Sequence, residues 1–93
     1  MASKKADQMV KEMARVLRER RAGIGASLNA LSAASSLDRA ALHRTENGDR
    51  IPSLPFWVDW ADTLGMPLEK VMAEARKRVG KAAGKPPERK ALV

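Results

Sequence analysis

The stretch SLDRAALHRTENG, residues 36–48, carries the chain's single histidine between two arginines. On a helix that advances about 100° per residue, one face of this stretch gathers hydrogen-bond donors around a small side chain. That face consists of Arg39, Ala40, His43, Arg44 and Asn47. Arginine can donate two hydrogen bonds to guanine in the major groove of DNA, and a small apolar side chain can lie against a thymine methyl group. The pattern indicates either a base-reading surface or a basic face that is simply solvated.

The elements around this face are predicted from local signals. Ala41, Leu42 and Thr45 share the opposite side of the same helix and are expected to pack inward. Asp38 is a suitable N-cap, and Gly48 can end the helix in the left-handed conformation. No glutamate stands four residues before either arginine of the outward face, which favours an external partner.

Composition and charge restrict the class of protein. The chain has 93 residues, enough for one small domain, and no cysteine, so no disulfide supports its core. Its formal net charge of +7 is unevenly distributed. Residues 51–75 hold one lysine and four acidic side chains, whereas residues 76–93 hold seven basic side chains and one acidic. This distribution indicates one side that faces a polyanion and a different far side.

Several classes of function are not expected. One histidine, no cysteine, no cluster of metal-ligand residues and no glycine-rich phosphate loop leave no candidate for catalysis, so we predict no enzyme, cofactor or metal. No apolar run approaches the ~18 residues that cross a membrane, and the first residues, MASKKADQ, lack the apolar stretch of a signal peptide. We therefore expect a cytoplasmic, nucleoid-associated protein without a membrane partner.

Glycine, proline and capping residues divide the chain into five predicted helices. The segments run over about 4–21, 27–34, 38–47, 54–64 and 67–79, and the sequence predicts an all-α fold. Residues 1–79 would form the domain. Residues 80–93 mix glycine, proline and charge and are predicted to be a basic, disordered tail. Three roles stay open for it: nonspecific contact with DNA, which we rank first, an appendage without a role, and a segment that orders against a partner.

Helical spacing also predicts which side chains are buried. The first helix has a stripe of apolar residues that Arg21 continues, and Ile24 is expected to fold back onto the core. On the last two helices the predicted inward residues are Leu54, Trp57, Val58, Ala61, Leu64, Leu68, Val71, Met72 and Ala75. Phe56 and Trp60 lie to one side of this stripe and are candidates for a dimer interface. For Trp60 alone we favour extension of the core, and for Phe56 we favour contact with a partner.

An ordered series of short motifs covers residues 17–72. LRERR is followed by Ser27 with Leu31, a turn, HRTENG, PSL and TLGMPLEKV. This series resembles the helix-turn-helix domain of the XRE family, which contains the phage Cro and CI repressors. The resemblance implies a five-helix, lambda-repressor-like bundle in which the second and third helices form the helix-turn-helix and the third is the recognition helix.

The resemblance also assigns residues by position. It places Arg39, Ala40, His43 and Arg44 at base edges, and Ser27, Leu28, Asn47, Asp49 and Arg50 at phosphates. It implies a buried salt bridge between Arg21 and Glu46. Three positions depart from the family pattern: Leu28 replaces a usual Gln, Ser36 a usual Gly, and Asp49 a common basic residue.

Together these features predict a sequence-specific transcriptional regulator that binds double-stranded DNA as a homodimer on an inverted repeat. Such a small domain is similar to the controller proteins of restriction-modification systems and to compact regulators of phages and integrative elements. A contact with RNA polymerase would accompany regulation, and activation and repression both stay open. The alternative is an antitoxin-like or other protein-interaction module in which DNA binding is a secondary, autoregulatory activity.

Overall fold

The computed structural model describes residues 4–82, and these residues form five helices and no strand. The helices are α1 (Lys4–Gly23), α2 (Leu28–Ala34), α3 (Arg39–Glu46), α4 (Leu54–Thr63) and α5 (Leu68–Ala82). The predicted all-α fold is therefore confirmed. Within the described range, none of the helices is long and apolar enough to cross a membrane. Helix α5 extends beyond the predicted limit at residue 79, and residues 83–93 of the predicted tail lie outside the described residues.

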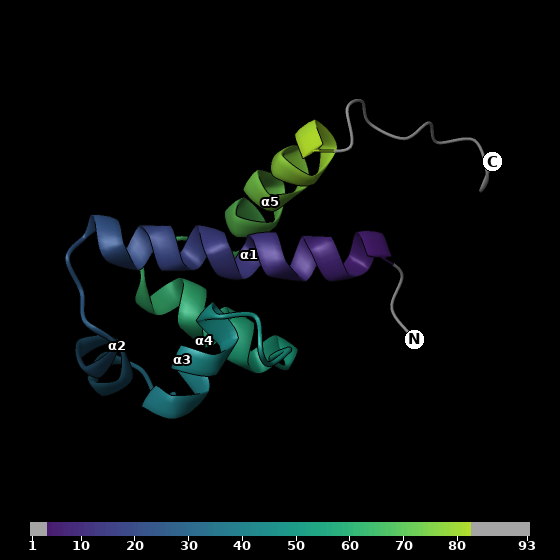
Figure 1. Ribbon diagram of the computed structural model, residues 1–93. Coiled ribbons are helices and arrows are strands. Elements are labelled where there is room, and N and C mark those ends of the chain that lie inside the picture. Colours follow the sequence, from purple (N-terminus) through teal and green to yellow (C-terminus); the bar gives the residue numbers. More distant parts are fainter. Residues whose placement is uncertain (1–3, 83–93) are drawn as a thin grey trace.

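The long helix α1 runs through the middle of the molecule, with α5 on one side and α2, α3 and α4 on the other (Figure 1). Four of these helices contribute a completely buried side chain to one core: Leu17 from α1, Leu42 from α3, Trp60 from α4 and Val71 from α5. Because α3 packs through this core, its orientation is determined by the rest of the domain rather than by α2 alone.

Three helices begin at capping side chains. The side-chain oxygens of Ser27 and Asp38 each accept a hydrogen bond of 3.0 Å from the backbone N–H three residues later, and Ser53 accepts one of 3.4 Å. Each oxygen satisfies one of the N–H groups that a helix start leaves without a partner. At the end of α3, Gly48 has a φ of 81°, a conformation that glycine adopts without strain. The predicted limits of α2, α3 and α4 are therefore correct to within about one residue.

An ion-pair cluster fixes α5 against α1. Arg78 of α5 donates hydrogen bonds of 3.0 and 2.7 Å to the two carboxylate oxygens of Glu19 in α1, and one of 3.2 Å to Glu74. The bond from Arg78 holds the pKa of Glu19 below its usual range, and the same bond raises the pKa of Arg78. The charge of Arg78 is therefore paired within the protein and is not free to attract an external anion.

Several predicted core residues are exposed. Ile24 is 52% exposed because the core residues of α1 end at Leu17, about two turns before it. On α4, the buried residues include Trp57, Trp60 and Ala61, so Leu54 and Val58 point to solvent. Met72 of α5 is also exposed, since Val71 and Ala75 take the inward positions.

The prediction of Trp60 as a dimer-interface residue is wrong. Its side chain is completely buried within the single chain. Its ring stacks on Trp57 with centroids 5.4 Å apart and meets Phe56 edge to face at 6.1 Å. A side chain that is already covered on all sides has no surface left for a second copy, so Trp60 belongs to the core, which is the interpretation favoured for it from the sequence.

Candidate nucleic-acid interface

One face of α3 is anchored in the protein. Ala41, Leu42 and Thr45 are buried as predicted, and the hydroxyl of Thr45 donates a 2.7 Å hydrogen bond to the carbonyl of Ala41. This bond satisfies a buried polar group that would otherwise cost free energy. Because these side chains must stay buried, α3 cannot rotate about its own axis, and the same face always points outward.

The opposite face is open. Arg39, Ala40, His43, Arg44 and Asn47 are all exposed, as the helical spacing predicts. Within residues 4–82, Arg39 and Arg44 form no ion pair. The amide nitrogen of Asn47 lies 3.4 Å from Nε2 of His43 and can donate to that nitrogen when it carries no proton. The face therefore presents a continuous row of donors, with the Cβ of Ala40 among them, to an external partner.

The turn between α2 and α3 has no strained residue. Ser36 stands where the resemblance expects glycine, yet no described residue other than glycine has a positive φ. The hydroxyl and the backbone N–H of Ser36 instead donate to the Oδ2 of Asp59 in α4, at 2.8 and 3.4 Å. The carboxylate of Asp59 thus holds the turn in a conformation that does not require glycine.

Arg21 and Glu46 form the ion pair that the resemblance implies. The guanidinium of Arg21 donates to both carboxylate oxygens of Glu46, at 2.6 and 2.9 Å, and to the carbonyl of Ala26 at 2.8 Å. The side chain of Glu46 is only 4% exposed. The hydrogen bond with Glu46 raises the pKa of Arg21. This pair joins α1, the turn before α2 and the last residue of α3, and so it fixes the C-terminal end of the exposed face.

The residues assigned to phosphates have different environments. Ser27, Asn47 and Asp49 are exposed, whereas Leu28 is half-buried against the core. Leu28 therefore offers only its backbone to a phosphate. The side chain of Asp49 is an anion and would repel one.

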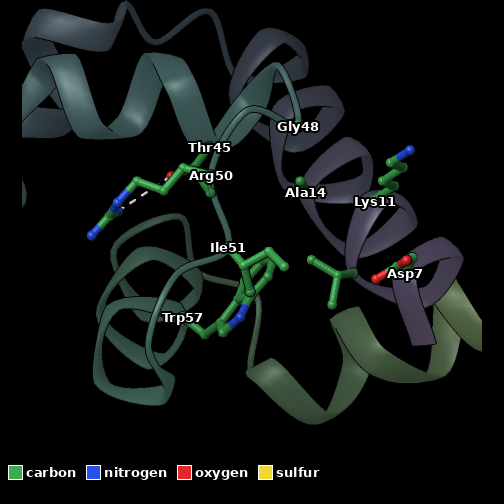
Figure 2. A pocket seen from close by; sticks show the side chains of 9 residues that line it. Asp7, Lys11, Ala14, Thr45, Gly48, Arg50, Ile51 and Trp57 are labelled. Atoms are coloured by element: carbon green, nitrogen blue, oxygen red, sulfur yellow. Dashed lines mark hydrogen bonds between the residues drawn. The ribbon is translucent and has the colours of Figure 1, made fainter. Parts of the chain in front are cut away.

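Arg50 is held in place by two neighbours. Its NH1 group lies 3.4 Å from the Oγ1 of Thr45, and its guanidinium carbon lies 4.8 Å from the centre of the Phe56 ring. Figure 2 shows the side chain of Arg50 extending away from α1, with the bond to Thr45 dashed. A cation over an aromatic ring is attracted by the ring's quadrupole. The half-buried Phe56 thus supports a basic side chain near the end of α3.

The cavity drawn in Figure 2 does not suit a ligand. It has a volume of about 100 Å³ between α1 and the segment that follows α3, and residues such as Val10, Ala14 and Trp57 line it. Pockets for small molecules usually measure ~300–1,000 Å³. In the described part of the chain, no group of histidine or acidic side chains could hold a metal ion. The exposed face of α3, with its row of hydrogen-bond donors, is the main candidate for function.

A family model described as a helix-turn-helix domain matches residues 12–75 of the chain. The chain belongs to the helix-turn-helix domain family. No curated protein and no solved structure matches it significantly. The matched segment contains α2 and α3, which are the helix-turn-helix pair. Helix-turn-helix domains are DNA-binding modules rather than catalytic ones, and the second helix of the pair enters the major groove.

Proposed function

We propose that this helix-turn-helix protein is a sequence-specific transcriptional regulator that acts in the cytoplasm as a homodimer on an inverted-repeat operator. The observation that carries the proposal is the row of exposed donors on α3, a helix that the buried face and the Arg21–Glu46 pair hold in one orientation. A rigid element places donors at base edges with little loss of conformational entropy on binding. A contact with RNA polymerase belongs to the same proposal.

The roles within this interface follow from position and chemistry. Arg39, Ala40, His43 and Arg44 read base edges, because they are exposed and lie towards the N-terminal end of α3, the part of a recognition helix that contacts bases. Arg50 and Asn47 contact the sugar-phosphate backbone where α3 ends. Ser27 and Leu28 contact it at the start of α2, Leu28 through its backbone, and Asp49 lies beside it without adding attraction.

Base reading can be tested by binding-site selection on the wild-type protein and on the variants Arg39→Ala and Arg44→Ala. We expect each variant to lose preference at one or two base pairs, since a bidentate pair contributes about 1–3 kcal/mol of discrimination. That corresponds to a roughly 5- to 150-fold weaker preference for the original base.

Arg76→Ala is the matched control, because Arg76 is an exposed arginine on α5, across α1 from the helix-turn-helix pair (Figure 1). It should leave the selected sequence unchanged. Weaker binding with an unaltered preference in Arg39→Ala and Arg44→Ala would assign both arginines to phosphates and contradict the proposed readout.

A cluster of exposed apolar side chains supports a dimer. Ile51 and Leu54 are 67% and 66% exposed, and Val58 lies one turn beyond Leu54 on α4 and is also exposed. They come shortly after the recognition helix in the chain, and apolar side chains grouped on a surface are typical of protein contacts. This patch is the proposed interface between two copies. Phe56 is half-buried and lies about 160° around α4 from Leu54 and Val58, so it is a separate candidate for contact with a second copy.

The variant Leu54→Glu tests the dimer. We expect it to shift the protein toward monomer and to weaken binding to the full inverted repeat more than to a half-site, because a carboxylate in an apolar interface must be desolvated without a partner. Light scattering after size exclusion at tens of micromolar measures the mass.

Ile24→Glu is the control for this experiment, since Ile24 is an exposed isoleucine in the turn after α1 and not part of the dimer patch. It should leave the dimer intact. A wild-type protein that is monomeric both free and on the inverted repeat would contradict the proposed dimer.

The exposed side chains Ile24 and Met72 favour a second candidate function, because they lie just after α1 and on α5 rather than on the dimer patch. They would suit an antitoxin-like module that covers a partner protein and regulates its own operon. Isolation of the native complex distinguishes the two functions: a stoichiometric second protein in it supports the module, and the homodimer alone supports the regulator.

A further inference from the structure

Helix α1 carries a second basic surface that the recognition helix does not include. Lys11, Arg15 and Arg18 follow one another at spacings of four and three residues, so they lie within about 60° of one another around the helix. All three are exposed. Figure 2 shows the amine of Lys11 pointing away from Trp57 and hence from the core.

These three side chains form one wall of an open groove of about 420 Å³. The other wall is the end of α3 and the turn after it, formed by Glu46, Asn47, Gly48 and Asp49. The groove therefore lies between α1 and the end of the recognition helix.

The charges along the groove favour an anion. Glu46 is neutralised by Arg21, and Arg15 is paired with Glu12 at 2.8 Å but stays 60% exposed. Lys11 and Arg18 form no ion pair within residues 4–82. Asp49 is the one groove carboxylate without an ion-pair partner among the described residues. Two cations without an ion-pair partner among the described residues, and a third that is paired but exposed, thus face a single unneutralised carboxylate.

The position of the groove indicates which anion. Asn47 belongs both to the exposed face of α3 and to the wall of the groove. A recognition helix that ends here leaves the major groove here, and the chain then passes the sugar-phosphate backbone. From Lys11 to Arg18 the helix rises about 10 Å, which is about the axial rise of three steps from one phosphate to the next on one strand.

We propose that the groove between α1 and the turn after α3 binds the phosphate backbone of duplex DNA beside the base-read site, through Lys11, Arg15 and Arg18. This proposal rests on the proposed function and extends it, because it adds a contact surface outside the helix-turn-helix pair. The three cations strengthen binding to any sequence and leave the base preference to α3.

The test compares two triple variants that remove the same charge. Lys11→Gln/Arg15→Gln/Arg18→Gln alters the groove, and Lys70→Gln/Arg76→Gln/Lys77→Gln alters exposed residues of α5 on the far side of α1 (Figure 1). The affinity for a selected duplex with flanking base pairs is measured by fluorescence anisotropy over a range of salt concentrations. Circular dichroism checks that both variants are folded.

We expect the groove variant to reduce the slope of log K against log salt concentration by about 2 to 3, because each neutralised phosphate contributes about 0.9. The α5 variant should keep the wild-type slope, and both should select the wild-type sequence. As a further check, Asp49→Asn should raise the affinity severalfold, since it removes repulsion between a carboxylate and a phosphate. If Asp49 had only a structural role, its replacement by Asn would not raise the affinity for DNA.

Two results would overturn the groove assignment while the proposed function stands: a groove variant with the wild-type slope, or equal losses of slope in both triple variants, which would show an effect of net charge alone. If the cations instead served an acidic protein partner, the groove variant would also keep the wild-type slope. A wild-type protein without sequence preference for DNA would overturn the proposed function itself, and a wild-type protein that does not bind DNA would overturn both.

Discussion

The variant Trp60→Ala is expected to lower the free energy of unfolding by about 3–5 kcal/mol. Trp60 is completely buried, stacks on Trp57 and contacts Phe56, so its removal leaves a large cavity where α4 meets the rest of the core. A domain of this size is typically stable by about 4–12 kcal/mol, so the variant would lose a large fraction of its stability. Urea titration followed by circular dichroism measures the loss.

Phe56→Ala is the control for this prediction. Phe56 is half-buried at the margin of the core, and its loss should cost about 1–2 kcal/mol. The variant Trp60→Phe separates burial from hydrogen bonding, because the indole Nε1 of Trp60 is buried with no hydrogen-bond partner among the described residues. Phenylalanine removes this unsatisfied donor and keeps an aromatic ring, so its cost should be well below that of alanine.

If Trp60→Ala kept the wild-type stability and only dissociated a dimer, the assignment of Trp60 to the core would be wrong.

Helix α4 shows where sequence patterns are insufficient to predict burial. On α4, apolar residues occur on most sides of the helix, from Leu54 through Trp57 and Val58 to Trp60. Periodicity then allows more than one rotation, and only packing against α1 and α5 decides that Trp60 faces inward while Leu54 faces solvent.

The exposed face of α3 was predictable for the opposite reason. Its two sides differ clearly in composition, with Leu42 and Thr45 on one side and two arginines on the other, so a helical projection gives one solution. The starts of α2 and α3 were also predictable, because Ser27 and Asp38 act on backbone groups only three residues away. Features that depend on residues close together in the chain can therefore be predicted from the sequence.

Contacts between distant residues were not predictable from local patterns. Ser36 bonds to Asp59, 23 residues later, and Arg78 bonds to Glu19 across 59 residues. Nothing in the spacing of these side chains indicates their partners. The pairing of Arg21 with Glu46 was anticipated through the resemblance to a known family, while the sequence by itself showed only that a charge on the buried stripe of α1 needed a partner.

The variant Glu46→Ala is expected to lower the free energy of unfolding by about 3 kcal/mol. The carboxylate of Glu46 is 4% exposed and accepts two hydrogen bonds from Arg21, whose side chain is only 18% exposed. Alanine would leave the guanidinium in a poorly solvated position without its counter-charge. The end of α3 would also lose its connection to α1, so the affinity for DNA should fall together with the stability.

Glu19→Ala provides a closely matched control. Glu19 also accepts two hydrogen bonds from one arginine, Arg78, but its side chain is 54% exposed. Water can solvate both charges once this pair is broken, so the cost should be less than about 1 kcal/mol. The difference between the two glutamate variants therefore measures the effect of burial on otherwise similar ion pairs.

A double replacement distinguishes a stranded charge from a lost contact. In Arg21→Met/Glu46→Leu neither charge is buried, and apolar side chains of similar volume fill the space, so we expect much of the stability lost in Glu46→Ala to return. Thermal unfolding by circular dichroism of the wild type and the three variants is sufficient. An unchanged melting temperature in Glu46→Ala would contradict the structural role of this pair, and a double variant less stable than Glu46→Ala would show that the hydrogen bonds of Arg21, including the one to Ala26, matter more than its charge.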